Sequence, residues 1–200
     1  MYQMLENNIT LLLLITYRGD CFLNMNTNNI YVRHLELKDA RALLDLLLRN
    51  REFFQPFEPI REESHFTLEG KEVEITNSIL GVQTDQSYIF GIFLEETNEL
   101  IGRIALTGIA RGPFQNAYLG YYIDQKHNGN GYATAAVSLC VNFAFSEIGL
   151  HRIQAGVMPR NLSSIRVLVK AGFRHEGLAK AYLKINNVWE DHELFAITAE

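Results

Sequence analysis

The segment that most constrains the fold runs from residue 116 to residue 158, where two strand patterns flank a glycine turn and a helix pattern. Residues 116–123 (NAYLGYYI) are rich in tyrosine and predict a strand. After the turn DQKHNGNG, apolar residues recur at the 3.6-residue period of a helix, at positions 133, 136, 137, 140, 141, 144, 145 and 148. Residues 151–158 (HRIQAGVM) predict the next strand. Such a β-α-β unit has parallel strands and a right-handed crossover.

The rest of the chain from residue 30 onward adds strands and helices around this unit. Residues 30–35 predict a strand, 37–50 and 67–86 two helices, and 87–94 and 99–109 a hairpin. Between the first two helices, residues 51–66 form a proline-containing loop with exposed aromatic residues. A helix over 161–173 and two strands near 174–184 and 189–198, joined by Asn186-Asn187, close the chain. The expected class is α/β, with a mixed sheet of six to seven strands and flanking helices.

Composition narrows the class of protein. The 200 residues are 48% hydrophobic and 20% charged, which suits one globular domain. The net charge of −5 implies no basic surface, so nucleic acid is not expected as a partner. Two unrelated cysteines, Cys21 and Cys140, indicate no disulfide framework, and the six histidines show no metal-ligand spacing. A cytoplasmic protein without a metal is expected.

The first 24 residues form an N-terminal extension to the domain expected over 25–200. Their apolar run, Ile9–Ile15, is too short to span a membrane, and a positively charged signal-peptide region is missing. No membrane association is therefore expected. The extension is either an extra element packed on the domain or the product of an upstream start codon. The second interpretation is favoured, with Met25 as the natural start.

The glycine turn predicts a site for a phosphate or pyrophosphate. Glycines allow left-handed backbone conformations, and the N–H groups at the start of the following helix have no partner within the helix. A plain turn is the alternative. A nucleoside triphosphate is disfavoured because no lysine follows Gly131, and a dinucleotide because Thr134 replaces the third glycine. The residues expected to bind are Asn128, Gly129, Asn130, Gly131, Tyr132, Ala133 and Thr134.

Two blocks together resemble a known superfamily. Asn128-x-x-Gly131-x-Ala133 is similar to the acetyl-coenzyme A (acetyl-CoA) motif of the GCN5-related N-acetyltransferases (GNAT), although that motif begins with Gln or Arg. A second block of that superfamily is matched by Asn161, Ser164, Lys170, Gly172 and Phe173. The resemblance is to the RimJ/RimL-type group, which acetylates N-terminal amines of ribosomal proteins, and covers about residues 30–197. Taken singly, Asn161 and Gly172 are also ordinary helix caps.

The resemblance implies a GNAT fold in which two parallel strands, 116–123 and 152–158, splay apart to admit acetyl-CoA. Gly129–Thr134 would hold the pyrophosphate, and backbone N–H groups of Tyr122 and Ile123 would face the pantetheine and the oxyanion. Asn161 and Ser164 would complete the binding site. Acetyl would pass directly to an amine in a ternary complex, without a covalent enzyme intermediate.

For catalysis, the resemblance implies a candidate acid but leaves the base open. Ser164 is expected to serve the departing thiolate, with Tyr182 as the alternative acid. The glutamate that many relatives use as a base is replaced here by Tyr118. Glu58, Asp124, Glu36 and Glu190 stay open as carboxylates that take the proton through water.

Three functions stay open at this point. The expected function is acetylation of the N-terminal amine of a protein, ribosomal proteins in particular, by a monomer or homodimer. The alternatives are a small-molecule amine acetyltransferase, acting on a polyamine, aminosugar or amine toxin, and a sensor that binds acyl-CoA without turnover. Residues 51–66 should decide between the two enzymes: an open groove would suit a peptide, a closed pocket a small amine.

Overall fold

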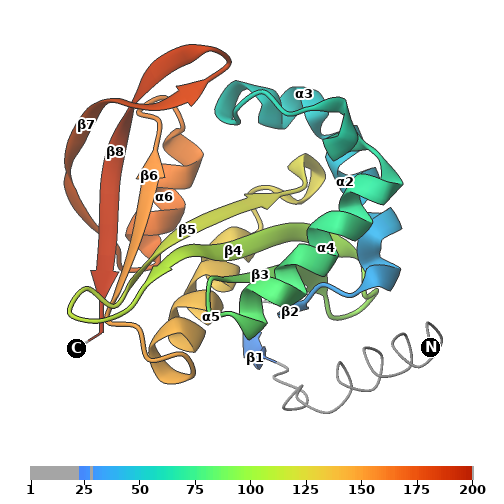
Figure 1. Ribbon diagram of the computed structural model, residues 1–200, viewed down its shortest axis with the longest axis horizontal. Helices are drawn as coiled ribbons and strands as arrows, with labels where there is room; N and C mark the ends of the chain where they lie inside the picture. The colour runs from blue at the N-terminus through green and yellow to red at the C-terminus, as the bar shows by residue number, and fades with distance from the viewer. Residues whose placement is uncertain (1–22, 28, 200) are drawn as a thin grey trace, which may run out of the picture.

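A mixed β-sheet runs through the molecule (Figure 1). The computed structural model describes residues 23–27 and 29–199, and in these the sheet has eight strands in the order β1-β2-β3-β4-β5-β6-β8-β7. The strands are β1 (Leu23–Thr27), β2 (Ile30–His34), β3 (Ser87–Leu94), β4 (Leu100–Ala110), β5 (Asn116–Ile123), β6 (Arg152–Val157), β7 (Arg174–Ile185) and β8 (Val188–Thr198).

The pair β5 and β6 is parallel, whereas its neighbours in the sheet pair antiparallel. The two strands are in register only where they begin, from Asn116 opposite Arg152 to Tyr118 opposite Gln154. Beyond that point they separate, although β5 stays paired with β4 as far as Ile123 and β6 with β8 as far as Val157. The expected splayed parallel pair is therefore present.

Helices cover both faces of the sheet (Figure 1). The helix α2 (Ala40–Arg49) and the helix α4 (Leu68–Gln83) lie on one face, and α5 (Tyr132–Ser146) and α6 (Leu162–Lys170) lie on the other. Short helical turns connect them: η1 (Leu37–Asp39), α3 (Arg51–Phe54), η2 (Gln55–Phe57), η3 (Glu63–Phe66) and η4 (Gln125–His127).

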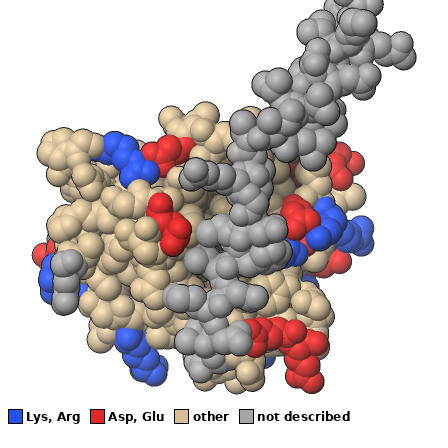
Figure 2. Space-filling model, turned by 90° about the horizontal axis from the view of Figure 1, so that it is seen from below, with Lys and Arg blue, Asp and Glu red and all other residues tan. Residues whose placement is uncertain are grey.

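Two apolar clusters hold these layers together. The larger one packs α5 and α6 on the sheet and includes the fully buried Phe90, Ile104 and Ile153. The smaller one packs α2 on α4 and includes Leu43 and Ile75. Burying one such side chain contributes about 1.5–3 kcal/mol, so the clusters fix both helical layers. On the face shown in Figure 2, charged side chains lie scattered among uncharged ones.

Local sequence signals account for the ends of these elements. Asn186 and Asn187 both have positive φ, 48° and 66°, which is the two-residue turn expected between β7 and β8. The helix α6 begins at Asn161, whose side chain accepts a hydrogen bond from Ser164 N, and Gly172 follows its end with φ 89°.

Two sequence expectations need correction. The sheet has eight strands in place of six to seven, because β1 pairs with β2 and was not predicted. Residues 51–66 are not a plain loop, since α3, η2 and η3 lie within them. The expected boundary before Met25 falls inside β1, and the apolar run Ile9–Ile15 lies outside the described residues. Within the described part of the chain, no helix is long and apolar enough to cross a membrane.

Candidate active site

The turn between β5 and α5 has the backbone geometry of an anion cradle. Gly129 and Gly131 have φ of 85° and 81°, in the left-handed region that glycine enters without strain. The first hydrogen bond of α5 runs from Ala135 N to Gly131 O, so the N–H groups of Tyr132, Ala133 and Thr134 have no partner within the helix. They carry the positive end of the helix dipole, which suits a pyrophosphate.

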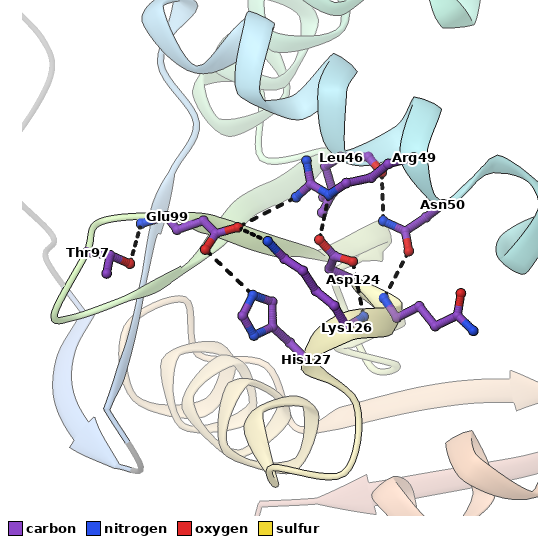
Figure 3. Close-up of polar contacts among 9 residues, drawn as sticks. Leu46, Arg49, Asn50, Thr97, Glu99, Asp124, Lys126 and His127 are labelled. Atoms are coloured by element: carbon purple, nitrogen blue, oxygen red, sulfur yellow. Dashed lines mark hydrogen bonds and ion pairs between the residues drawn. The ribbon is translucent and has the colours of Figure 1, made fainter.

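The cradle is attached to the end of α2 by buried polar contacts (Figure 3). Arg49 Nε donates to Asp124 Oδ2 at 2.6 Å, and Asn50 Oδ1 accepts from Gln125 N at 2.9 Å. Asn50 also donates to Leu46 O at 2.8 Å. Asp124 and Asn50 are each only 2% exposed, so these bonds are shielded from water. They fix η4, the segment that leads into the glycines.

A second group of charged residues lies next to these contacts, at the start of β4. Glu99 accepts from Lys126 Nζ at 2.6 Å, and its other oxygen lies 3.7 Å from His127 Nε2 (Figure 3). Glu99, Asp124 and His127 bring potential metal ligands together. Because Lys126 and Arg49 already neutralise the two carboxylates, the group is an ion-pair network.

A cavity of about 1350 Å³ extends from the cradle, past the gap between β5 and β6, to the segment 53–78. Its walls come from both sides of the gap: Leu119–Ile123 of β5, and Ala155–Met158 on and beside β6. The site residues expected from the sequence that line it are Tyr122, Ile123, Asn128, Ala133, Asn161 and Ser164.

Ser164 stands at the first turn of α6, against the gap. Its hydroxyl lies 2.8 Å from Tyr121 Oη, which also donates to Ser164 O at 3.2 Å. Burial raises the pKa of Tyr121 to about 12, so the phenol is a proton donor at neutral pH. From the sequence, the neighbouring Tyr122 and Ile123 are expected at the site, but this hydrogen bond of Tyr121 is not predicted, because nothing in the sequence pairs residues 43 positions apart.

Tyr182 lies apart from Ser164. It stands on β7 just after Ala181, a position with φ 48°, and it does not line the cavity. Its ring packs over Gly156 and beside His192, with ring centroids 5.5 Å apart. Burial, together with the nearby Tyr118, raises its pKa. The glycine-turn residues Gly129, Asn130, Gly131, Tyr132 and Thr134 also lie outside the lining, at the cradle end.

The segment from α3 to η2 forms part of the cavity wall and is joined to the opposite side of the site. Phe53, Phe54 and Phe57 line the cavity, and the Phe54 ring lies 4.9 Å from the Tyr122 ring. Asn186 Nδ2 donates to Gln55 O at 2.9 Å, and Arg160 donates to Pro56 O at 3.2 Å. The first bond connects the segment to the β7–β8 turn (Figure 1), and the second connects it to the loop between β6 and α6.

A charged cluster lies under the same end of the cavity. Lys71, which is 0% exposed, donates to Glu74 at 2.5 Å and lies 3.0 Å from His65 Nδ1. Arg103 Nε stands 3.3 Å from Glu74 Oε1, within ion-pair distance, although the geometry gives no hydrogen bond. Burial raises the pKa of Glu74, but the charges of Arg103 and Lys71 outweigh it and hold that pKa below its usual value.

The structure distinguishes between the four carboxylates that the sequence left open as the base. Asp124 is bound to Arg49, and Glu190 to Arg160 at 2.8 Å. Glu36 pairs with Lys38 at 2.7 Å and is not part of the cavity wall. Glu58 is the one of the four that lines the cavity, and burial raises its pKa.

Comparison with known proteins decides the family. A family model described as acetyltransferase (GNAT) domain matches residues 29–174. The chain belongs to the GNAT acetyltransferases.

Relatives and solved structures agree with this family. Over 168 residues the chain is 51% identical to the probable N-acetyltransferase YjcK of Bacillus subtilis, covering 84% of this chain and 93% of that protein. It is 35% identical to the ribosomal protein uS5-alanine N-acetyltransferase of Escherichia coli, over 87% and 90% of the two chains. A ribosomal-protein-S5-alanine acetyltransferase from Vibrio fischeri superposes with a TM-score of 0.83 at 32% identity, over 87% and 95% of the chains.

A further solved structure bears on the donor. Mycobacterium smegmatis RimJ in complex with CoA-disulfide has a TM-score of 0.81 and 30% identity, over 85% of this GNAT chain and 82% of that one. This GNAT chain is an N-acetyltransferase that uses acetyl-CoA as acetyl donor. Its turn and the gap between β5 and β6 fit that donor, because the free N–H groups at the start of α5 could bind a pyrophosphate and the unpaired strand edges a pantetheine.

Proposed function

We propose that this acetyltransferase modifies the N-terminal amine of a protein, with ribosomal proteins as the acceptor class. The observation that carries the proposal is the 35% identity to the uS5-alanine acetyltransferase over nearly the whole chain. The cavity supports it as well, since it extends past the gap toward residues 53–78 and leaves room for an acceptor chain end beside the donor.

In this proposal the residues of the chain bind the donor, orient the amine and protonate the departing sulfur. The α5 N-terminus holds the pyrophosphate. The Ile123 N–H faces the carbonyl oxygen of the acetyl group, because N–H directions alternate along β5 and those of Tyr122 and Asp124 point toward β4. Holding the amine next to the thioester lowers the activation barrier of acetyl transfer, because the translational and rotational entropy is lost on binding and not in the chemical step. Ser164, hydrogen bonded to Tyr121, delivers the proton to the departing sulfur. Tyr182 is the weaker candidate for that step because it does not line the cavity.

A small amine is the second candidate acceptor. The bonds from Asn186 to Gln55 and from Arg160 to Pro56 hold the 53–57 segment against the β7–β8 turn and the loop between β6 and α6. This arrangement restricts access on that side, as expected for a pocket that encloses a small substrate.

The test is thiol release from acetyl-CoA with a panel of acceptors. The panel contains peptides with the N-terminal sequences of ribosomal proteins, the same peptides with a blocked N-terminus, and polyamines and aminosugars. We expect turnover on free N-terminal peptides and none on the blocked ones. Turnover on small amines alone would replace the proposal by the second candidate. Tight binding of acetyl-CoA without turnover on any amine would indicate the sensor.

A further inference from the structure

His192 is a buried histidine on β8 that the proposed function does not use. Its side chain lines the cavity, yet the residue is only 3% exposed. A buried titratable side chain that lines a cavity is a candidate for a functional role. The residue therefore needs a chemical account.

A hydrogen bond fixes the tautomer of His192. Its Nδ1 lies 3.1 Å from the main-chain oxygen of Glu190. Because a carbonyl oxygen only accepts, Nδ1 carries the proton. In the neutral ring, Nε2 then has a free lone pair and acts as a proton acceptor.

The Nε2 side of the ring lies beside the gap. Cδ2, which is bonded to Nε2, stands 3.7 Å from the position that a Cβ on Gly156 would occupy. Gly156 belongs to β6, one wall of the gap, and itself lines the cavity. This distance places the imidazole edge against the strand where the donor thioester would lie.

The charged groups around His192 are paired with each other. Glu190 on β8 is bound to Arg160, which follows β6, and Asp191 to Lys180 on β7 at 2.7 Å. Tyr182 on β7 packs against the ring. Because the neighbouring cations Arg160 and Lys180 are each paired with a carboxylate, a cationic amine can approach His192 without meeting an unpaired positive charge.

The charges around Glu58 differ from those around His192. It faces Arg61, Arg103 and the buried Lys71, and Glu74 is the anion among its neighbours. An acceptor ammonium that approached Glu58 would meet these cations, which makes the position unfavourable for taking its proton.

We propose that His192 Nε2 is the base that deprotonates the acceptor amine; this rests on the proposed function. The ammonium gives one proton to Nε2, which makes a neutral amine and an imidazolium. The nitrogen lone pair forms the C–N bond as the C–S bond breaks. Ser164 gives a proton to the departing sulfur, which forms the CoA thiol, and the second amine proton passes to solvent. Solvent reprotonates Ser164, and His192 returns its proton to solvent. The net products are the acetamide, CoA thiol and one proton.

The test compares the wild type with His192→Asn across pH, using an N-terminal peptide that the wild type acetylates. Asparagine keeps an N–H donor for Glu190 O but has no basic nitrogen. At pH 7 we expect kcat/KM to fall at least about 100-fold, the lower end of the effect of a general base. Near pH 9.5 the amine, with a pKa of about 8, is already neutral, so the deficit should shrink about tenfold or more.

Three further variants make the outcome specific. His192→Gln serves if the asparagine variant is unstable, and thermal unfolding and acetyl-CoA affinity report on folding of both. His175→Asn, on the same hairpin and outside the cavity, should keep wild-type kcat/KM. Glu58→Gln should show no deficit that shrinks with pH.

The outcomes separate this proposal from the proposed function. Wild-type kcat/KM in the His192 variants at pH 7, or a deficit that is the same at pH 9.5, would overturn the role of His192. A pH-dependent deficit in Glu58→Gln would assign the base to Glu58 and overturn it too. If the wild type binds acetyl-CoA but acetylates no peptide, the proposed function itself fails.

Discussion

Positive φ at Gly131 couples the backbone of the turn to anion binding. With φ of 81°, the residue ends the turn so that the next three N–H groups point out of the helix end. A side chain there costs about 1 kcal/mol of strain. A carboxylate would in addition place negative charge where the pyrophosphate binds.

We therefore predict that Gly131→Asp raises the Kd for acetyl-CoA at least tenfold, measured by calorimetry. The matched control is Gly112→Asp, which also has positive φ, 69°, but no heavy atom within 4 Å of an added Cβ. It should suffer similar strain and keep the wild-type Kd. Equal loss of affinity in both variants would show that strain, and not the cradle, is responsible.

His65 gives a prediction on pH. Burial, with the charge of Lys71 adding to it, lowers its pKa to about 4. A histidine with a depressed folded-state pKa stabilises the fold above its unfolded pKa of about 6.5, and this contribution is lost as the pH falls from there toward 4. Between pH 7 and pH 5 the loss amounts to about 2 kcal/mol.

The measurement is the free energy of unfolding by denaturant at pH 7 and pH 5. His65→Gln should remove most of the difference between the two pH values that the wild type shows. Replacing the exposed His151 by glutamine should leave that difference as in the wild type. An unchanged difference in His65→Gln would contradict the assignment.

At the scale of elements, α2 does more than cover the sheet. Its last residue, Arg49, and the following Asn50 hold η4 (Figure 3), while α3, which forms part of the cavity wall, begins at Arg51. One helix end therefore positions both the segment that leads into the glycine turn and the start of this wall.

Removing the Asn50 side chain should loosen the cradle. Asn50→Ala leaves Gln125 N and Leu46 O without their buried partner, which costs about 1–3 kcal/mol of stability. We expect the KM for acetyl-CoA to rise several-fold while kcat at saturation changes less than twofold. Arg41→Ala, at an exposed position of the same helix, is the control and should leave KM unchanged. A fall in kcat with constant KM would contradict the positioning role.

Elements with strong local signals were predictable from the sequence. The position of the glycine turn between a strand and a helix, the amphipathic α2 and the Asn-Asn hairpin turn are encoded by neighbouring residues and are confirmed. The phosphate site at the glycine turn stays a prediction. The cluster of Lys71, Glu74 and Arg103 was not predictable, because α4 has no clear apolar face and Arg103 comes from a distant strand. His192 was missed for the same reason: its burial and its contact with Gly156 exist only after β6, β7 and β8 have assembled. The roles of Ser164 and Tyr182 stay predictions.

For the whole molecule, donor binding joins two parts of the sheet. β5 with its neighbours and β6 with its neighbours are paired to each other over only three residue positions. A ligand that contacts both walls and binds only the folded state stabilises it by RT ln(1 + [L]/Kd), about 2.7 kcal/mol at 100 times Kd.

We expect this concentration of acetyl-CoA to raise Tm by about 5–11 °C, measured by scanning calorimetry. Dephospho-CoA, which keeps the pyrophosphate, should retain most of the shift. Pantetheine, which lacks that group, should produce little of it. A full shift with pantetheine alone would contradict the role of the cradle.

The separation of β5 from β6 also bears on strand pairing between molecules. An unpaired strand edge normally invites the strand of another molecule to add to it. Here two such edges lie inside the sheet and face one another across a slot bordered by α6 and the 53–57 segment. Because these layers line the same cavity, the recess that the proposed function assigns to the donor also keeps the two edges from the strand of another molecule.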